Sequence, residues 1–389
     1  MKKLSNAAQR LKGQAMFQIL AKAQELERVG KEILHFELGD PDFDTPENVV
    51  NVACEALKVG ETHYAPSTGI RELKDVAAKV TKSSRGFCPD LDQLLVCPGA
   101  NSIIYYAIAC TVNPGEEVIV PDPGFVSYFS IIDYLGVTPV RVQLKESNEF
   151  RLNPDDVEKA ITDKTRMIIV NSPSNPTGAV MTKEELTRIY EIAKKYDLFL
   201  LSDEIYARMI YHEKDIDFFS PSSLDHCKER TIIVNGFSKS FAMTGWRLGV
   251  ATGPSQIIEK MGLLLETTTS CVSPFIQRGG VEALLGSQKI IYEMVDEYRK
   301  RRDVMVEGLN SLPGVSCLKP KGAFYVFPSI KETGYSSQQF TELVLKKAGV
   351  AVTPGPIFGN NGEGFVRLCY VNSVENIRRA ILNIRKVLV

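Results

Sequence analysis

The chain of 389 residues lacks most of the features that mark secreted, metal-binding or membrane-spanning proteins. Its eight cysteines form no CxxC pair, and its four histidines are scattered, so no zinc-site spacing is present. The longest uncharged run, residues 94–115, is interrupted by Pro98 and Gly99, which is atypical of a membrane span. The amino terminus carries no apolar core of the kind found in signal peptides. We therefore expect a cytoplasmic protein with free, mostly buried thiols, no metal site and no membrane association.

Neither sign of charge is in excess. Lysine and arginine number 46 and the acidic residues 47, so the formal net charge is −1. Proteins that bind nucleic acid or membrane surfaces typically show a basic balance or a basic amphipathic stretch, and we expect neither partner here. With 44% hydrophobic and 24% charged residues, the composition is typical of a soluble globular protein. At roughly 150 residues per domain, the length predicts more than one substructure.

Short apolar runs alternate with helical segments through the middle of the chain. These runs are almost continuously apolar rather than alternating, which is typical of strands buried on both faces of a mostly parallel sheet. The expected strands are residues 94–97, 117–121, 138–143, 166–171, 198–203, 231–235 and 247–252. The expected helices between them are residues 102–112, 126–135, 154–160 and 182–196. This alternation predicts an α/β domain with an open sheet flanked by helices.

After residue 254 the pattern changes to long helices, expected at residues 277–285 and 289–310. A compact tail follows, with strands expected near residues 314–318, 323–328 and 365–369. We therefore expect a large α/β domain over residues 46–284 and a smaller α+β domain over residues 285–389. The amino-terminal segment, residues 1–45, is expected to join the small domain.

Polar residues follow several of the predicted strands. In open α/β sheets the ligand lies at the carboxyl ends of the strands, so these residues are expected to converge. The segments concerned are residues 98–101, 122–125, 171–176, 203–206 and 238–239. They carry the kinds of group that a charged aromatic cofactor needs.

The most informative stretch is residues 238–249. Lys239 follows an apolar run, and Arg247 stands just ahead of the next one. A buried lysine beside hydroxyl groups and a fixed cation suits Schiff-base chemistry, in which the amine condenses with a cofactor aldehyde and the guanidinium binds its phosphate. Taken alone, the same residues are also compatible with a surface lysine on a loop.

Together these segments resemble the fold-type I pyridoxal-phosphate aminotransferases, in particular the branch that acts on aspartate and aromatic amino acids. The resemblance covers nearly the whole chain and rests on motifs at residues 39–46, 64–66, 175–178, 202–206, 238–249, 322–325 and 366–368. It implies a large domain with a mostly parallel sheet, a smaller α+β domain and pyridoxal 5′-phosphate as cofactor. The implied activity moves the amino group of an L-amino acid to a 2-oxo acid by a ping-pong mechanism.

By this resemblance, Lys239 is the catalytic residue, which binds the cofactor covalently and then moves a proton between the substrate Cα and the cofactor C4′. Asp203 pairs with the pyridine nitrogen and keeps the ring an electron sink, although alone it could be a helix cap. Tyr206 and Asn175 donate hydrogen bonds to the ring oxygen, although an Asn-Pro pair is also common in plain turns. Phe125 stacks on the ring, where an ordinary core aromatic is the alternative.

The cofactor phosphate is expected to bind at the start of a helix, where the backbone N–H groups of Ala100 and Asn101 are free. Arg247 adds a full charge and Ser238 a hydroxyl. Relatives often place the phosphate hydroxyl three residues before the lysine, where this chain has Gly236.

The substrate carboxylate is expected to bind Arg367 through a two-pronged hydrogen bond, with Asn175 and the backbone of Gly39 beside it. Taken alone, Arg367 could be a solvated strand arginine. Tyr64 corresponds to a family tyrosine that reaches the phosphate of the neighbouring subunit. The resemblance therefore implies a homodimer.

The donor is less clearly defined by the motifs. Some relatives that act on aspartate carry a lysine where this chain has Asn101, and many have tryptophan where it has Phe125. Without that cation we expect a neutral or aromatic donor, with 2-oxoglutarate or pyruvate as acceptor. Aspartate remains possible because Arg10 or Lys12 of the amino-terminal segment could supply the charge.

Two other functions compete with this interpretation. A β-lyase on the same scaffold would use the same residues, and only its products would distinguish it. A non-catalytic regulatory module that binds amino acids would normally carry a DNA-binding domain, and no helix-turn-helix precedes residue 30. Residues 237–240 end like a P-loop but lack its glycines, which disfavours a nucleotide-binding enzyme.

Overall fold

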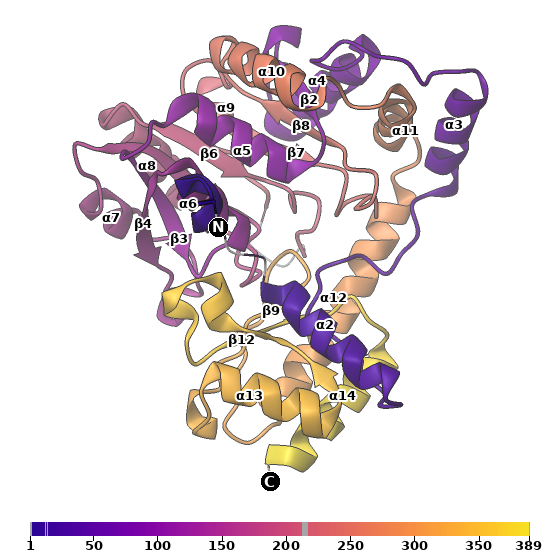
Figure 1. The fold of residues 1–389 in the computed structure, drawn as a ribbon, viewed down its shortest axis with the longest axis vertical. Coiled ribbons are helices and arrows are strands. Elements are labelled where there is room, and N and C mark those ends of the chain that lie inside the picture. Colours follow the sequence, from indigo (N-terminus) through magenta and orange to yellow (C-terminus); the bar gives the residue numbers. More distant parts are fainter. Residues whose placement is uncertain (1, 12, 14, 212–216, 389) are drawn as a thin grey trace.

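The computed structural model describes residues 2–11, 13, 15–211 and 217–388 (Figure 1). A large part built on a central sheet lies above a smaller part, and one long helix, α12, runs from one to the other (Figure 1). The strands are β1 (Leu34–His35), β2 (Leu94–Cys97), β3 (Glu117–Asp122), β4 (Thr138–Gln143), β5 (Thr165–Asn171), β6 (Phe199–Asp203), β7 (Thr231–Gly236), β8 (Gly249–Thr252), β9 (Tyr325–Val326), β10 (Val350–Ala351), β11 (Thr353–Pro354) and β12 (Val366–Cys369).

The helices cover both faces of the large sheet and build most of the small part (Figure 1). Among the described helices, none combines the length and apolarity needed to cross a bilayer. The α-helices are α1 (Asn6–Arg10), α2 (Ala15–Arg28), α3 (Glu47–Lys58), α4 (Arg71–Arg85), α5 (Ala100–Thr111), α6 (Val126–Leu135), α7 (Pro154–Lys159), α8 (Lys183–Lys195), α9 (Ser222–Asp225), α10 (Ser255–Thr269), α11 (Pro274–Leu285), α12 (Lys289–Asn310), α13 (Ser337–Leu343) and α14 (Val374–Leu388).

The large sheet has seven strands in the order β2-β8-β7-β6-β5-β3-β4, and only β8 runs antiparallel to the others. Successive strand residues point to opposite faces, so Val118 packs with α5 and α6 while Ile119 packs with α8. Both faces are therefore buried, as the continuous apolar runs predicted. The predicted α/β class and mostly parallel sheet are confirmed.

The small part contains the antiparallel sheet β11-β12-β9, packed with α12, α13 and α14. The amino-terminal segment meets both parts: α1 contacts α6 of the large part, while β1 pairs in parallel with β10 of the small part. The domain boundaries at residues 45 and 284 stay predictions.

Two predicted strands differ from the structure. Residues 314–318 do not form a strand, because Ser316 makes only an isolated bridge to Ser329 after the turn at Gly314. The strand expected from residue 247 begins at Gly249, because Arg247 adopts a left-handed backbone with φ of 53°. That conformation takes Arg247 out of the strand and leaves its side chain at the edge of the sheet.

The thiols are less buried than expected. All eight cysteines are free, but only Cys97, Cys227, Cys317 and Cys369 are buried.

Candidate active site

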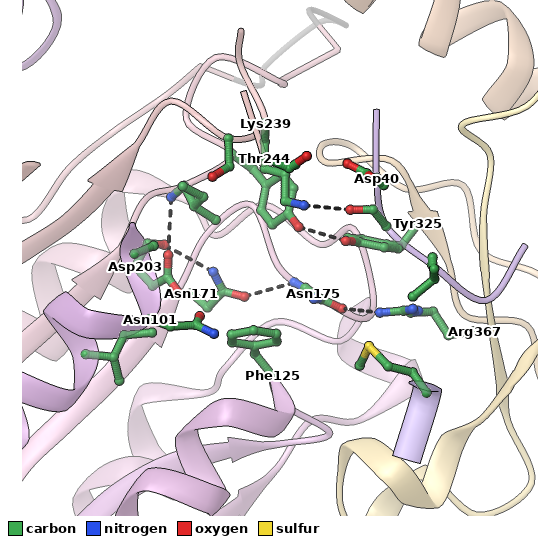
Figure 2. Close-up of a pocket in the computed structure, with 18 of the residues that line it drawn as sticks. Asp40, Asn101, Phe125, Asn171, Asn175, Asp203, Lys239, Thr244, Tyr325 and Arg367 are labelled. Carbon is green, nitrogen blue, oxygen red and sulfur yellow. Dashed lines mark hydrogen bonds between the residues drawn. The ribbon is translucent and has the colours of Figure 1, made fainter. Parts of the chain in front are cut away.

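A cavity of about 330 Å³ lies where the carboxyl ends of the central strands face the small part (Figure 2). All of the predicted site residues except Tyr64 line it: Gly39, Ala100, Asn101, Phe125, Asn175, Asp203, Tyr206, Ser238, Lys239, Arg247 and Arg367. The convergence follows from the sheet, because parallel strands deliver the residues that follow them to one edge.

Lys239 lies on the loop that follows β7 and is half-buried. Its Nζ donates a hydrogen bond to the carbonyl oxygen of Gly39 at 2.6 Å (Figure 2). Burial lowers the pKa of this amine to about 8, and the positive charges of Arg367 and Arg247 act in the same direction, against Asp40. An appreciable fraction of the amine is therefore uncharged near neutral pH and able to act as a nucleophile or base.

Asp203 is the last residue of β6 and is only 3% exposed. Its Oδ2 accepts a hydrogen bond from the Tyr128 hydroxyl at 2.5 Å, and its Oδ1 accepts one from the backbone N–H of Ile205 at 3.2 Å. Burial raises the pKa of this carboxyl from its usual 3.8 to about 6, although both hydrogen bonds oppose the shift. A cationic ring N–H placed here would favour the ionised carboxylate and so oppose the effect of burial.

A chain of hydrogen bonds crosses the cavity from Asp203 to Arg367 (Figure 2). The Asn171 side chain donates to the carbonyl oxygen of Asp203 at 3.1 Å and accepts from the backbone N–H of Asn175 at 2.9 Å. The Asn175 side-chain oxygen in turn accepts from Nη1 of Arg367 at 3.1 Å. The position of the arginine is thus tied to the end of β6.

Arg367 comes from β12 of the small part and is 1% exposed. Its Nη2 donates to the carbonyl oxygen of Glu37, and its guanidinium lies 4.6 Å from the ring centre of Tyr325. Among the described residues its Nε has no hydrogen-bond partner. A buried, unpartnered N–H on a fixed guanidinium fits a carboxylate ligand, which accepts from Arg in a two-pronged arrangement.

The backbone at Gly39 lies too close to Tyr325 for any residue with a side chain. A Cβ at this position would lie 2.0 Å from the hydroxyl oxygen of Tyr325. That hydroxyl is in turn 2.8 Å from the hydroxyl of Tyr206, so the ring is not free to retreat.

An anion-binding corner forms at the start of α5. Gly99 caps this helix with φ of 88°. The first N–H groups of the helix, from Ala100 and Asn101, have no intrahelical partners, and both residues line the cavity. A Cβ on Gly99 would lie 2.3 Å from Nη2 of Arg247. The guanidinium therefore sits directly over the helix start, where its charge and the helix dipole both suit a phosphate.

These features together fit a cofactor that carries an aldehyde, a basic ring nitrogen and a phosphate. Lys239 stands where the aldehyde would be held, Asp203 where the ring nitrogen would be held, and the α5 corner where the phosphate would be held. The fit rests on the donor set and on the unpartnered polar atom, and the role of each residue stays a prediction.

The structure places three predicted residues elsewhere or leaves them out. Tyr64 is 88% exposed and does not line the cavity of its own chain. Arg10 donates to the carbonyl oxygens of Asp133 and Tyr134 at the end of α6 and does not reach the cavity. Lys12 lies outside the described residues.

Sequence reasoning also missed several residues of the site. Tyr128 lies three positions after Phe125, one helical turn away on the same side of α6, and that spacing was an available signal. Asn171, Asp40 and Tyr325 stand inside the quoted motifs or strand ends but were given no role. Nothing in the sequence indicated that Met16 and Phe17 of α2 line the cavity.

Comparison with known proteins gives a consistent result. The family model "Aminotransferase class I and II" matches residues 31–384. The chain is 44% identical over 361 residues to an aspartate aminotransferase of Pyrococcus abyssi, with 92% of each chain covered. It is also 44% identical to aromatic-amino-acid aminotransferase 2 of Thermococcus litoralis, again with 92% of each covered. The structure of Thermus thermophilus aspartate aminotransferase with maleate superposes with a TM-score of 0.95 at 37% identity, over 100% of both chains.

The raised pKa of Asp203 predicts that its replacement stabilises the protein stripped of any cofactor. The folded state binds this proton more tightly than the unfolded chain, so stability is lost as the pH rises from 3.8 through about 6. The shift of roughly two units corresponds to about 3 kcal/mol at neutral pH. We expect Asp203→Asn to raise the free energy of unfolding at neutral pH, with the gain vanishing below the ordinary carboxyl pKa. Urea unfolding across pH measures this.

Asp225→Asn is the matched control. Asp225 is also buried, but its carboxylate accepts hydrogen bonds from the backbone N–H groups of Cys227, Arg230 and Thr231, so its replacement should destabilise the protein. A loss of stability in Asp203→Asn that grows with pH would contradict the prediction.

Proposed function

This chain belongs to the class I and II aminotransferases, and from that premise we propose that it moves the amino group of a neutral or aromatic L-amino acid to a 2-oxo acid through Lys239. It is a pyridoxal-phosphate-dependent enzyme. The observation that carries the residue assignment is the convergence of the Lys239 amine, the Asp203 carboxyl and the Arg367 guanidinium on one cavity.

When bound, pyridoxal phosphate supplies an aldehyde that condenses with amines and a ring that accepts the electron pair released at the substrate Cα. In our proposal Lys239 Nζ removes the proton from Cα and later returns a proton at the cofactor C4′. A pKa near 8 suits both directions, because the amine can accept and release a proton close to neutral pH. Asp203, held by Tyr128, keeps a negative charge beside the ring nitrogen.

The substrate is oriented from the other end of the cavity. Arg367 binds the α-carboxylate through Nε, whose N–H has no protein partner among the described residues, and through one N–H of Nη2, while the other N–H of Nη2 stays bonded to Glu37. Asn175 fixes the guanidinium, and the bare backbone at Gly39 leaves room for the ligand. Two points of attachment place the Cα–H bond beside the Lys239 amine, which is the positional requirement of the reaction.

The lining of the cavity favours an apolar donor side chain. One similar chain is named for aspartate and another for aromatic amino acids, so we base the proposed donor class on the residues that line the cavity. Among the described lining residues the cations are Lys239, Arg247 and Arg367, and each already has a proposed role. The lining also includes apolar side chains of the amino-terminal segment and the exposed carboxylate of Asp40, which would repel a second carboxylate. The apolar residues are Met16, Phe17 and Leu38.

We also propose a homodimer in which Tyr64 completes the phosphate site of a second copy. The support is its 88% exposure, which is high for an aromatic side chain, and its absence from the cavity of its own chain.

Replacing Lys239 tests the central role. We expect Lys239→Ala to lower the rate of transamination at least about 100-fold, because both the attachment point and the proton carrier are lost. Borohydride treatment should add the mass of the cofactor to the wild-type chain and not to the variant, as read by mass spectrometry.

Lys260→Ala, at an exposed position on α10, serves as the control and should retain both properties. Cofactor attachment that survives Lys239→Ala would contradict the assignment. Release of pyruvate and ammonia from a cysteine conjugate without any 2-oxo acid would instead support the competing β-lyase activity.

The donor preference is tested at Asp40. We expect Asp40→Asn to raise the ratio of kcat/KM for aspartate to that for phenylalanine by about threefold, since removing one exposed like charge is worth roughly 0.5–1 kcal/mol. The ratio is the readout because Asp40 also affects the pKa of Lys239, which acts on both donors alike. Initial rates with each donor and 2-oxoglutarate give both values, and Asp44→Asn, which lies outside the cavity, is the control. A preference of about tenfold or more for aspartate in the wild-type enzyme would overturn the proposed donor class.

The dimer is tested at Tyr64. We expect twice the chain mass by sedimentation and a Kd for pyridoxal phosphate about tenfold higher in Tyr64→Phe, which loses one hydrogen bond to a charged group. Tyr292→Phe, at another exposed tyrosine, should leave the Kd unchanged. A monomer whose cofactor affinity is insensitive to Tyr64→Phe would rule out this arrangement.

A further inference from the structure

A second cavity lies behind the loop that carries Lys239. Ser238 and Lys239 face the active-site cavity, whereas Phe237, Ser240 and Phe241 line the second one. Its other walls come from the carboxyl-terminal half of α4, from strands β7 and β8, and from residues 207, 208, 218 and 284. The aminotransferase reaction as described above uses none of these side chains except through the shared loop.

Two arginines enter this cavity, and one of them is already neutralised. Arg85 is buried, and its Nη2 and Nε lie 2.6 and 2.8 Å from Oε2 of Glu204, which is also buried. Glu204 further accepts hydrogen bonds from the hydroxyls of Ser202 and Ser220. The charge of Arg85 is thus balanced by that of Glu204.

Arg208 has no such compensation. Among the described residues no carboxylate pairs with it, and only its Nη1 has a hydrogen-bond partner, the neutral side-chain oxygen of Gln288. The Phe241 ring holds the guanidinium at 5.1 Å from the ring centre. Burial and the like charge of Arg85 both lower the pKa of Arg208, while Tyr292 acts in the opposite direction without cancelling them. An anionic partner would therefore stabilise the charged form.

The remaining walls are mostly apolar. The apolar side chains include Ala77, Val80, Phe218, Ile233, Phe237 and Leu284, and the polar ones are Thr81, Ser84, Asn235, Ser240 and Thr252. A fixed guanidinium at the side of an apolar slot selects for a ligand with one anionic end and an apolar body. Of the two arginines, only Arg208 has no carboxylate partner among the described residues, so a ligand with a single negative charge matches the cavity.

We propose that this cavity is a second ligand site, which binds a small monocarboxylate with an apolar body through the guanidinium of Arg208. The carboxylate replaces the missing acidic partner, and the apolar body displaces water from Phe218, Ile233 and Phe237.

Benzoate is the probe, titrated calorimetrically into the holoenzyme. Because benzoate can also bind Arg367, the two sites are separated by crossed variants. We expect two binding sites in the wild type, loss of one in Arg208→Gln and loss of the other in Arg367→Gln. The affected site should weaken at least about tenfold, as expected for one charge-assisted interaction. Arg208→Gln should keep the wild-type transamination rate, which also shows that it folds.

Three further measurements fix the interpretation. Val80→Trp, which fills the apolar slot without touching the charge, should also abolish the second site, and it decides the matter if Arg208→Gln does not fold. Arg71→Gln, an exposed arginine at the start of α4, should bind like the wild type. Benzamide, the neutral analogue, should not bind.

Benzoate binding that is unchanged in both Arg208→Gln and Val80→Trp would overturn the proposal and leave the aminotransferase assignment intact. Inorganic phosphate that binds Arg208 as tightly as benzoate would also overturn it, because the apolar body would then contribute nothing.

Discussion

Three hydrogen bonds run from Asp203 through Asn171 and Asn175 to Arg367, and the geometry of the site depends on them. They join the end of a strand in the large part to a strand in the small part. All four residues are buried or nearly so, and a buried amide left without a partner costs about 1–3 kcal/mol. These side-chain amides therefore help to fix the spacing between the groups proposed to hold the cofactor ring and the substrate carboxylate.

The same cavity contains groups that folding alone does not satisfy. Burial raises the pKa of Asp203 and lowers that of Lys239, and Arg367 keeps an unpartnered N–H. Each of these groups lowers the stability of the protein alone. Each would stabilise the protein once it is paired with a ligand of opposite charge or matching hydrogen-bonding groups. Ligand binding should consequently stabilise the fold, and the dipoles and charges are already in place when the ligand arrives.

Much of this site could be predicted because it depends on strand ends. Lys239, Asp203 and Asn175 follow apolar runs, and the rule that parallel strands share an edge brings them together without further information. The position of Tyr128 in the site depends on the turn of helix α6. Residues 314–318 do not form a strand, because strand pairing needs a partner that the sequence does not reveal. Tyr64 is a different case, since its proposed contact lies on another copy of the chain.

The second cavity could not have been predicted, and the reason lies in two adjacent residues. Asp203 is the last residue of β6, and Glu204, which follows it, still donates its backbone N–H to Val234 of the neighbouring β7. Consecutive residues of such an extended backbone point to opposite faces of the sheet. Asp203 therefore faces the active site, while Glu204 faces the back of the sheet and pairs there with Arg85. That pairing occupies the acid nearest in sequence to Arg208, and no other carboxylate of the described residues pairs with Arg208. Whether a charge is paired depends on the folded chain. Arg85 and Arg208 look equivalent in the sequence, but they differ in this respect in the structure.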